Sequence, residues 1–107
     1  MPISQKVLTK PKRSTNFYND ALILASIIEK EASFNDDKAL ISSVFHNRLK
    51  FGYVLGADST INFITGQTSK NLNTQIDSEY NTYKNLGLPP TPINNPQIDS
   101  IVAAIKP

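Results

Sequence analysis

Two glutamates, Glu29 and Glu31, follow a long apolar run and are the strongest candidates for acid–base chemistry. The run extends from Ala21 to Ile28 and is nearly all apolar. Two positions along a helix correspond to a rotation of about 200°, so the two carboxyl groups must project from different sides. Glu31 follows Ile27 and Ile28 by four and three positions, which places it on the side that the fold buries.

A carboxyl group on the apolar side of a helix, close to its C-terminal end, is a candidate general acid. Desolvation and the negative end of the helix dipole both favour the protonated form, which can donate a proton to a leaving group. The alternative is a structural Glu31 held by a buried Arg or Lys. Glu29 faces the side of Ala25 and Ser26, where we expect solvent, and is predicted to support the acid.

Four further side chains could take part in chemistry. Arg48 lies on the apolar stripe of its helix and can reach a carboxylate of a neighbouring helix with two directed hydrogen bonds. His46 lies off that stripe and is expected at the surface. Asp58 is most simply a helix cap, but it could also be the second carboxylate of a hydrolase, across a cleft from Glu31. Tyr83, like Tyr80, is expected in the core.

Four helices are expected to position these residues. The first begins near Asn19 or Asp20 and ends about Ala32, and its apolar character predicts a central, buried helix. The second runs from about 37 to 51, after a cap at Asn35 or Asp36, and Gly52 ends it. A short helix covers 60–64 after a cap at 58 or 59 and ends at Gly66. The last is capped by Asn94 or Asn95. The core stripes of the second and last helices are Leu40, Ile41, Val44, Phe45, Arg48 and Leu49, and Ile98, Ile101, Val102 and Ile105.

The remaining segments are predicted to be irregular or extended. Residues 65–78 form a polar surface loop, and 80–83 a strand-like or extended segment. The prolines of residues 87–92 fix an extended wall. Residues 1–16 form a flexible basic arm, and 17–107 one domain. The fold class is mainly α, with α+β as the alternative.

Composition excludes several classes of protein. The net charge is +2, the basic residues are densest before Thr15, and the rest is nearly balanced, so no nucleic-acid surface is predicted. With no cysteine and one histidine, we expect no zinc site, and no cofactor motif is present. No apolar run approaches the ~18 residues that span a bilayer, and we expect this piece to be soluble.

Four segments, taken in order, carry a resemblance to a known family: Ala25-Ser26-Ile27-Ile28-Glu29-Lys30-Glu31, Val44-Phe45-His46-Asn47-Arg48-Leu49, Tyr80-Asn81-Thr82-Tyr83 and Gly87-Leu88-Pro89-Pro90-x-Pro92-Ile93-x-x-Pro96. They resemble the endolytic murein transglycosylases of the MltG (YceG-like) type, and the resemblance covers Leu22 to Pro107. The second glutamate of that family's Glu-Lys-Glu triplet is catalytic, and it corresponds to Glu31. The resemblance therefore implies a small lysozyme- or transglycosylase-like helical domain whose central buried helix carries the catalytic glutamate.

The resemblance implies non-hydrolytic cleavage between N-acetylmuramic acid and N-acetylglucosamine, with formation of 1,6-anhydro ends, in glycan-strand termination and cell wall assembly. It implies substrate-binding roles for Asn47, Arg48, Asp58, Thr60 and Tyr83. The implied partners are peptidoglycan glycan strands and peptidoglycan synthases (penicillin-binding proteins). The implied location is the extracytoplasmic face of the bacterial cytoplasmic membrane.

The chain departs from the family pattern in two respects. Gly56 and Ala57 stand where the family commonly has Gln and Thr, which removes side chains that could hydrogen-bond to substrate, and Ser59 stands where the family has Pro. The family also has a membrane anchor, a LysM-like region and a C-terminal segment, which residues 17–107 are expected to lack.

Three alternatives stay open at this point. The chain could be a non-catalytic peptidoglycan-binding fragment. It could also be a muramidase-type glycoside hydrolase that uses Glu31 and Asp58. The third is a small nucleic-acid- or protein-binding domain with a basic arm, which rests only on residues 6–13.

Overall fold

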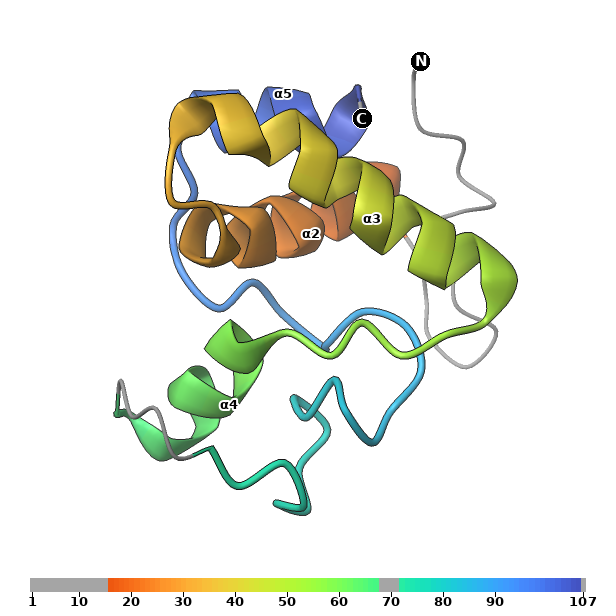
Figure 1. Cartoon of the computed structure of the whole chain (residues 1–107), viewed down its shortest axis with the longest axis vertical. Coiled ribbons are helices and arrows are strands. Elements are labelled where there is room, and N and C mark those ends of the chain that lie inside the picture. The colour runs from red at the N-terminus through yellow and green to blue at the C-terminus, as the bar shows by residue number, and fades with distance from the viewer. Residues whose placement is uncertain (1–15, 68–71, 107) are drawn as a thin grey trace.

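The computed structural model describes residues 16–67 and 72–106, and the regular structure in these ranges is helical, with no strand. Figure 1 shows α2, α3 and α5 gathered in one part of the molecule, and α4 with the irregular segment that precedes α5 in the other. The mainly helical class is therefore confirmed. In chain order the elements are α2 (Phe17–Glu31), the 3₁₀ turn η1 (Asn35–Asp37), α3 (Lys38–Phe51), α4 (Asp58–Thr65) and α5 (Ile98–Ile105).

Helix α2 is the central element, as predicted, and contacts α3, α4 and α5. Its side chains from Ile23 to Ile28 are all buried. The helix starts earlier than expected because Asn16, rather than Asn19 or Asp20, caps it: Asn16 Oδ1 accepts the Asn19 N–H at 3.1 Å. Asn16 therefore belongs to the helical unit, whereas the rest of the predicted basic arm lies outside the described residues.

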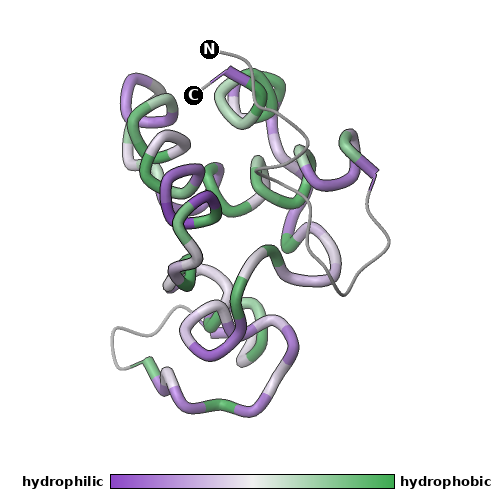
Figure 2. Tube along the Cα trace, turned by 90° about the vertical axis from the view of Figure 1, so that its right-hand side faces the viewer, coloured by the Kyte–Doolittle hydropathy of each residue, from purple (hydrophilic) through white to green (hydrophobic). Residues whose placement is uncertain are grey.

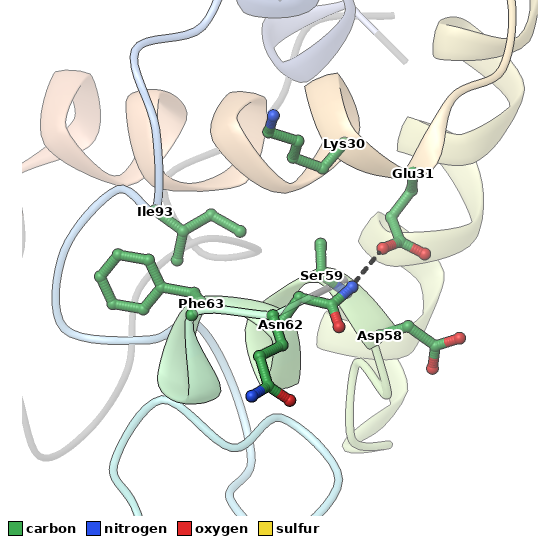
Figure 3. Close-up of a pocket in the computed structure, with 9 residues that line it drawn as sticks. Lys30, Glu31, Asp58, Ser59, Asn62, Phe63 and Ile93 are labelled. Atoms are coloured by element: carbon green, nitrogen blue, oxygen red, sulfur yellow. Dashed lines mark hydrogen bonds between the residues drawn. The ribbon is translucent and has the colours of Figure 1, made fainter. Parts of the chain in front are cut away.

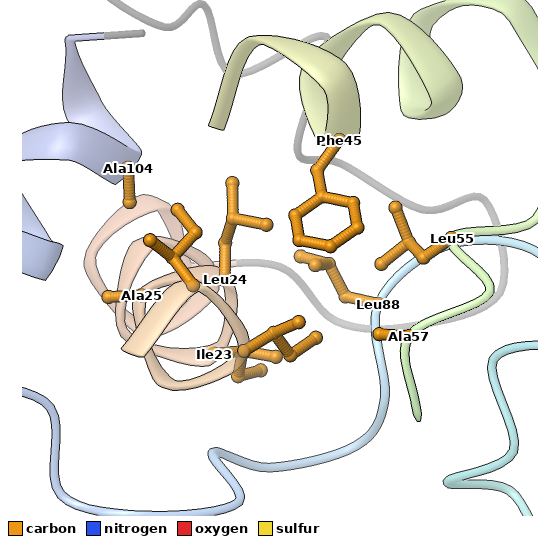
Figure 4. Close-up of a cluster of buried hydrophobic side chains, with 10 residues drawn as sticks. Ile23, Leu24, Ala25, Phe45, Leu55, Ala57, Leu88 and Ala104 are labelled. Carbon is orange, nitrogen blue, oxygen red and sulfur yellow. The ribbon is translucent and has the colours of Figure 1, made fainter. Parts of the chain in front are cut away.

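The hydrophobic core is built from the helices together with two loops (Figure 4). Phe45 of α3 packs against the α2 side chains, and Leu55, Ala57 and Leu88 close the core from irregular segments. Complete burial of a Leu, Ile or Phe side chain stabilises a fold by roughly 1.5–3 kcal/mol. The loops around the site are therefore anchored by their own apolar side chains.

Helix α3 is rotated relative to the expected stripe. Leu40 is 68% exposed and Val44 40%, whereas His46, expected at the surface, is only 7% exposed. The reason is that α5 packs against the side of α3 that carries Ser42 and His46. The predicted stop at Gly52 is confirmed, with φ of +78°. The predicted cap at Asn35 or Asp36 is wrong, since the N-cap position is Asp37.

Polar contacts join α3 to the C-terminal end of α5. Ser42 Oγ donates to the Ala103 carbonyl at 2.6 Å, and His46 Nε2–H donates to the Ala104 carbonyl at 2.9 Å. The last carbonyls of a helix have no partner within the helix, so these two side chains satisfy groups that burial would otherwise leave unpaired. Burial lowers the pKa of His46, although its bond to Ala104 opposes this shift.

The expected core face of α5 is also partly wrong, because α5 packs against the side of α3 that carries Ser42 and His46. Ile98 is 78% exposed and Val102 51%, while Ser100, Ala103 and Ala104 are buried. The predicted caps at Asn94 and Asn95 are also wrong, because the N-cap position is Gln97.

The segment before α5 forms turns where an extended or strand-like conformation was expected at residues 80–83. Asn81 organises this segment from a fully buried position. Its Nδ2 donates to the carbonyls of Thr74 and Ile76 at 3.0 and 2.7 Å, and its Oδ1 accepts the Tyr83 N–H at 2.9 Å. Figure 2 shows this part of the chain as mostly hydrophilic or neutral, so these hydrogen bonds hold it in addition to the apolar contact of Leu88 with the core.

Candidate functional site

Glu31, the last residue of α2, points toward the N-terminal end of α4 (Figure 3). Its Oε2 accepts the Ser59 backbone N–H at 3.0 Å. Ser59 is the second residue of α4, where backbone N–H groups lack intrahelical partners and the helix dipole favours a negatively charged group. Because proline has no N–H, this bond depends on the departure from the family pattern at position 59.

Helix α2 ends at Glu31 because the backbone of Ala32 turns to an extended conformation, with φ −81° and ψ 128°. Glu31 is half-buried and, among the described residues, it forms no salt bridge. The alternative, a structural glutamate held by a buried Arg or Lys, is therefore not found among these residues. Its neighbour Lys30 extends its amine away from the Glu31 carboxyl (Figure 3).

A pocket of about 600 Å³ lies between the end of α2 and one face of α4. Glu31 and Asp58 are at one end, and Phe63 and Ile93 lie toward the other (Figure 3). A concave site with a few polar groups and apolar walls is the usual form of a small-ligand site. The lining residues are Lys30, Glu31, Asp58, Ser59, Asn62, Phe63, Gly66, Gln67 and Ile93.

Thr60, predicted to bind substrate, is fully buried and has no surface to offer a ligand. Its hydroxyl donates to the Ala57 carbonyl at 2.7 Å and lies 2.9 Å from Thr82 Oγ1. The Ala57 N–H donates to the same Thr82 oxygen at 2.9 Å. These bonds join the turn before α4 to residue 82, so Thr60 fixes the position of α4.

Arg48 holds the same turn from the other side, because its Nη1 donates to the Leu55 carbonyl. Its guanidinium also lies over the Phe45 ring, 6.0 Å from the ring centre. Neither Arg48 nor Asn47, which is exposed, is among the residues that line the pocket. The contacts of Arg48 are those of a positioning residue.

Asp58 and Tyr83 form a hydrogen-bonded pair beside the pocket, in which the Tyr83 hydroxyl donates to Asp58 Oδ1. This bond, burial, and the negative charges of Asp58 and Glu31 raise the pKa of Tyr83 to about 12, against a smaller opposing effect of Arg48. Gly56 makes room for the ring: its φ is +60°, and a Cβ there would lie 3.3 Å from Tyr83 Cε1. Tyr83 is half-buried and does not line the pocket, whereas Asp58 does.

The expected cap role of Asp58 is wrong, because Ala57 holds the N-cap position of α4 and Asp58 is its first residue. In Figure 3 the Asp58 carboxylate does not point toward that of Glu31. Its hydrogen bond turns it toward Tyr83 instead.

Glu29 lies at the other side of α2, where it holds the start of α5. Its Oε1 accepts the Ser100 hydroxyl at 2.6 Å and the Gln97 N–H at 3.0 Å. These two bonds, with a smaller contribution from Lys38, lower the pKa of Glu29 although burial opposes them. The expectation of solvent on this side is wrong: Ser26 is fully buried, since α5 and the segment that precedes it cover that face.

Two findings concern other kinds of site. In residues 16–67 and 72–106, no group of three or more His, Asp or Glu side chains could hold a metal ion. Within the same ranges, no helix is long and apolar enough to cross a membrane.

The YceG-like family model matches residues 3–107, and the chain belongs to this family. The structure is similar to the crystal structure of a putative yceG-like protein from Listeria monocytogenes, with a TM-score of 0.77 and 42% sequence identity. That match covers 96% of this chain and 34% of the Listeria chain.

Two curated relatives are named endolytic murein transglycosylase. The protein from Bacillus subtilis is 44% identical, over 80% of this chain and 25% of its own length. The protein from Streptococcus pneumoniae is 38% identical, over 82% of this chain and 17% of its own length. The chain thus spans a quarter or less of the length of these curated relatives.

Sequence reasoning missed three features of the site. The Ser59 N–H is a backbone donor, so no side-chain type indicates it. Phe63 and Ile93 enter the pocket from α4 and from the proline-rich segment, and neither was singled out. Asn81, in the middle of the Tyr80–Tyr83 segment, could have been found as a short amide side chain, since Asn forms local hydrogen bonds with the backbone and favours turns over strands.

Proposed function

We propose that this chain carries the catalytic glutamate of an endolytic peptidoglycan lytic transglycosylase. The observation that carries the proposal is Glu31 at one end of the pocket, with one carboxyl oxygen held by Ser59 and no salt bridge to a described residue. Membership of the YceG-like family and the names of two curated relatives support it. The substrate is the β-1,4 bond between N-acetylmuramic acid and N-acetylglucosamine within a glycan strand.

The two proton transfers of this reaction need only one carboxyl group. The Ser59 N–H occupies Oε2, which leaves Oε1 to carry the proton. Protonated Glu31 donates this proton to the glycosidic oxygen as the bond from the anomeric carbon to that oxygen breaks. The muramyl 6-hydroxyl then attacks the anomeric carbon and gives its proton to the Glu31 carboxylate. The 1,6-anhydro ring closes, the acid is regenerated and no water is consumed.

The remaining predicted site residues support this step in different ways. Asp58 lines the pocket beside Glu31 and can accept hydrogen bonds from sugar hydroxyls. Tyr83 orients Asp58, while Arg48 and Thr60 fix the turn that precedes α4. Asn47 is exposed on α3 and reaches a substrate only where a glycan extends beyond the pocket.

For a full-length member of the family, the same proposal puts the site at the extracytoplasmic face of the cytoplasmic membrane, where peptidoglycan is assembled. Peptidoglycan synthases are the fitting partners, because an endolytic enzyme that terminates strands acts on their product. Both statements rest on the family alone.

The test is the chemical form of the new ends after the purified chain acts on peptidoglycan. Mass spectrometry should show 1,6-anhydro-muramyl ends, which are one water lighter than reducing ends. Reducing ends would contradict the proposal and favour a hydrolase that uses Glu31 and Asp58. Cosedimentation with insoluble peptidoglycan without release of soluble fragments would contradict it in favour of a binding module.

A further inference from the structure

Phe63 presents part of an aromatic ring to the pocket that contains Glu31. Its side chain is 44% exposed, although it belongs to a helix that is packed against α2. A single exposed aromatic side chain needs no explanation on an open surface, but an aromatic wall in a concave polar site indicates ligand contact.

The Phe63 ring is held in place from one side. Its centre lies 4.9 Å from that of Tyr80, with the ring planes tilted by 42°. Tyr80 is fixed in turn, because its hydroxyl lies 2.8 Å from Thr91 Oγ1 in the proline-rich segment. The contact with Tyr80 restrains the ring on this side, which reduces the conformational entropy that the ring loses when a ligand covers it.

The position of the ring relative to Glu31 fits a carbohydrate chain. Ser59 holds Glu31, and Phe63 follows Ser59 by four residues on α4, an axial rise of about 6 Å, comparable to one sugar ring. Asn62 and Gln67, which also line the pocket, add polar groups around the aromatic wall. A pyranose ring matches this lining, since it has an apolar face of C–H groups and a polar rim of hydroxyl groups.

We propose that Phe63 is a stacking platform for the apolar face of one sugar ring of the glycan strand, adjacent to the bond that Glu31 protonates. The negative face of an aromatic ring attracts the polarised C–H groups of the sugar. This inference rests on the proposed function, because the ligand is the substrate of the same site.

The experiment measures binding separately from cleavage. Calorimetry gives the Kd of soluble, uncrosslinked peptidoglycan strands for the full chain in the Glu31→Gln background, where cleavage is blocked. Phe63→Leu should raise Kd about three- to tenfold, since an aromatic contact contributes roughly 0.5–1.5 kcal/mol. Phe63→Tyr keeps the ring and should bind within about twofold of the parent. Phe51→Leu, a 65% exposed phenylalanine at the end of α3, is the matched control and should not change Kd.

Two results would overturn the inference: Phe63→Leu and Phe51→Leu with equal Kd values, or Phe63→Tyr as weak as Phe63→Leu. Thermal unfolding of each variant identifies any loss of binding that comes from loss of the fold. Failure of the proposed function is a separate result, namely the absence of anhydro ends with the wild-type chain. A Kd that depends on the Phe63 ring without any cleavage would keep the sugar platform and reject the enzyme.

Discussion

Two carboxyl groups, two positions apart, serve the N-terminal ends of two different helices. Glu31 accepts a backbone N–H at the start of α4, and Glu29 accepts one at the start of α5. Their separation around α2 sends them to opposite sides, as the helical spacing requires. The same residue type therefore has two uses: Glu29 Oε1 accepts hydrogen bonds from both Ser100 and Gln97 and holds the start of α5, while Glu31 lines the pocket.

Glu29→Gln should lower the free energy of unfolding by about 1 kcal/mol at neutral pH, because hydrogen bonds to a charged acceptor are stronger than those to a neutral one. The pKa of Glu29 is lowered from 4.5 in the folded state, so this stabilisation is present above that pH and is lost as the pH falls through the folded pKa. Urea unfolding at neutral and acidic pH measures it.

Asp36→Asn removes an exposed carboxylate and serves as the control for Glu29→Gln. The difference between wild type and Glu29→Gln should shrink at acidic pH, while the control stays near wild type throughout. A difference that is equal at both pH values would show that charge on Glu29 is not the cause.

Asp58→Asn should lower the pKa of Tyr83 from about 12 toward the ordinary value of 10, because the carboxylate is the main cause of the shift. Since the raised pKa reflects a favoured neutral phenol, the folded state should lose stability as pH rises from about 10 to 12. Ultraviolet titration of tyrosinate should show one late-titrating group that Tyr83→Phe removes. Tyrosines that all titrate together in the wild type would contradict the hydrogen bond.

At the scale of elements, α5 is secured at both ends by polar side chains of other helices. Glu29 of α2 holds its first turn, and Ser42 and His46 of α3 hold its last carbonyls. The result is a helix of eight residues that packs closely on α2, although short isolated helices are marginal in water.

His46 should make the stability of this packing depend on pH. Its folded pKa is lowered from 6.5, so the unfolded chain takes up a proton first, and the free energy of unfolding falls as pH drops below 6.5. Unfolding of wild type and His46→Gln, whose amide can still donate, should be compared at pH about 7.5 and about 5.5. Only the wild type should lose free energy of unfolding through protonation of residue 46. An equal loss in both proteins would assign the effect to other groups.

Element positions were largely predictable, but element orientations were not. The apolar run of α2 and the stops at Gly52 and Gly66 are local signals, and they gave the helices to within a few residues. The exposed side of α3 depends on α5, whose contacting carbonyls lie 58–61 residues further along the chain. Periodicity alone cannot show that His46 pairs with such a carbonyl.

At the scale of the whole molecule, the site forms where the helical part meets the irregular part. α2 supplies Glu31, α4 supplies Ser59, Asp58 and Phe63, and the proline-rich segment supplies Ile93. Sequence reasoning predicted which side of α2 carries Glu31, since the helical face could be derived, but it did not predict the pocket that this residue lines. The pocket depends on the position of α4, which is fixed in part by a bond between residues 57 and 82, and no local pattern predicts a bond over 25 residues.

The most direct measurement is the rate at which 1,6-anhydro-muramyl ends appear when wild type, Glu31→Gln and the Asp36→Asn control digest peptidoglycan. The rate with Glu31→Gln should be lower by about 100-fold or more, because glutamine cannot donate the proton, while Asp36→Asn should keep the wild-type rate. The thermal unfolding of Glu31→Gln should stay unchanged, since a glutamine oxygen can still accept the Ser59 N–H. Anhydro ends formed by folded Glu31→Gln at the wild-type rate would contradict the assignment of Glu31 as the acid.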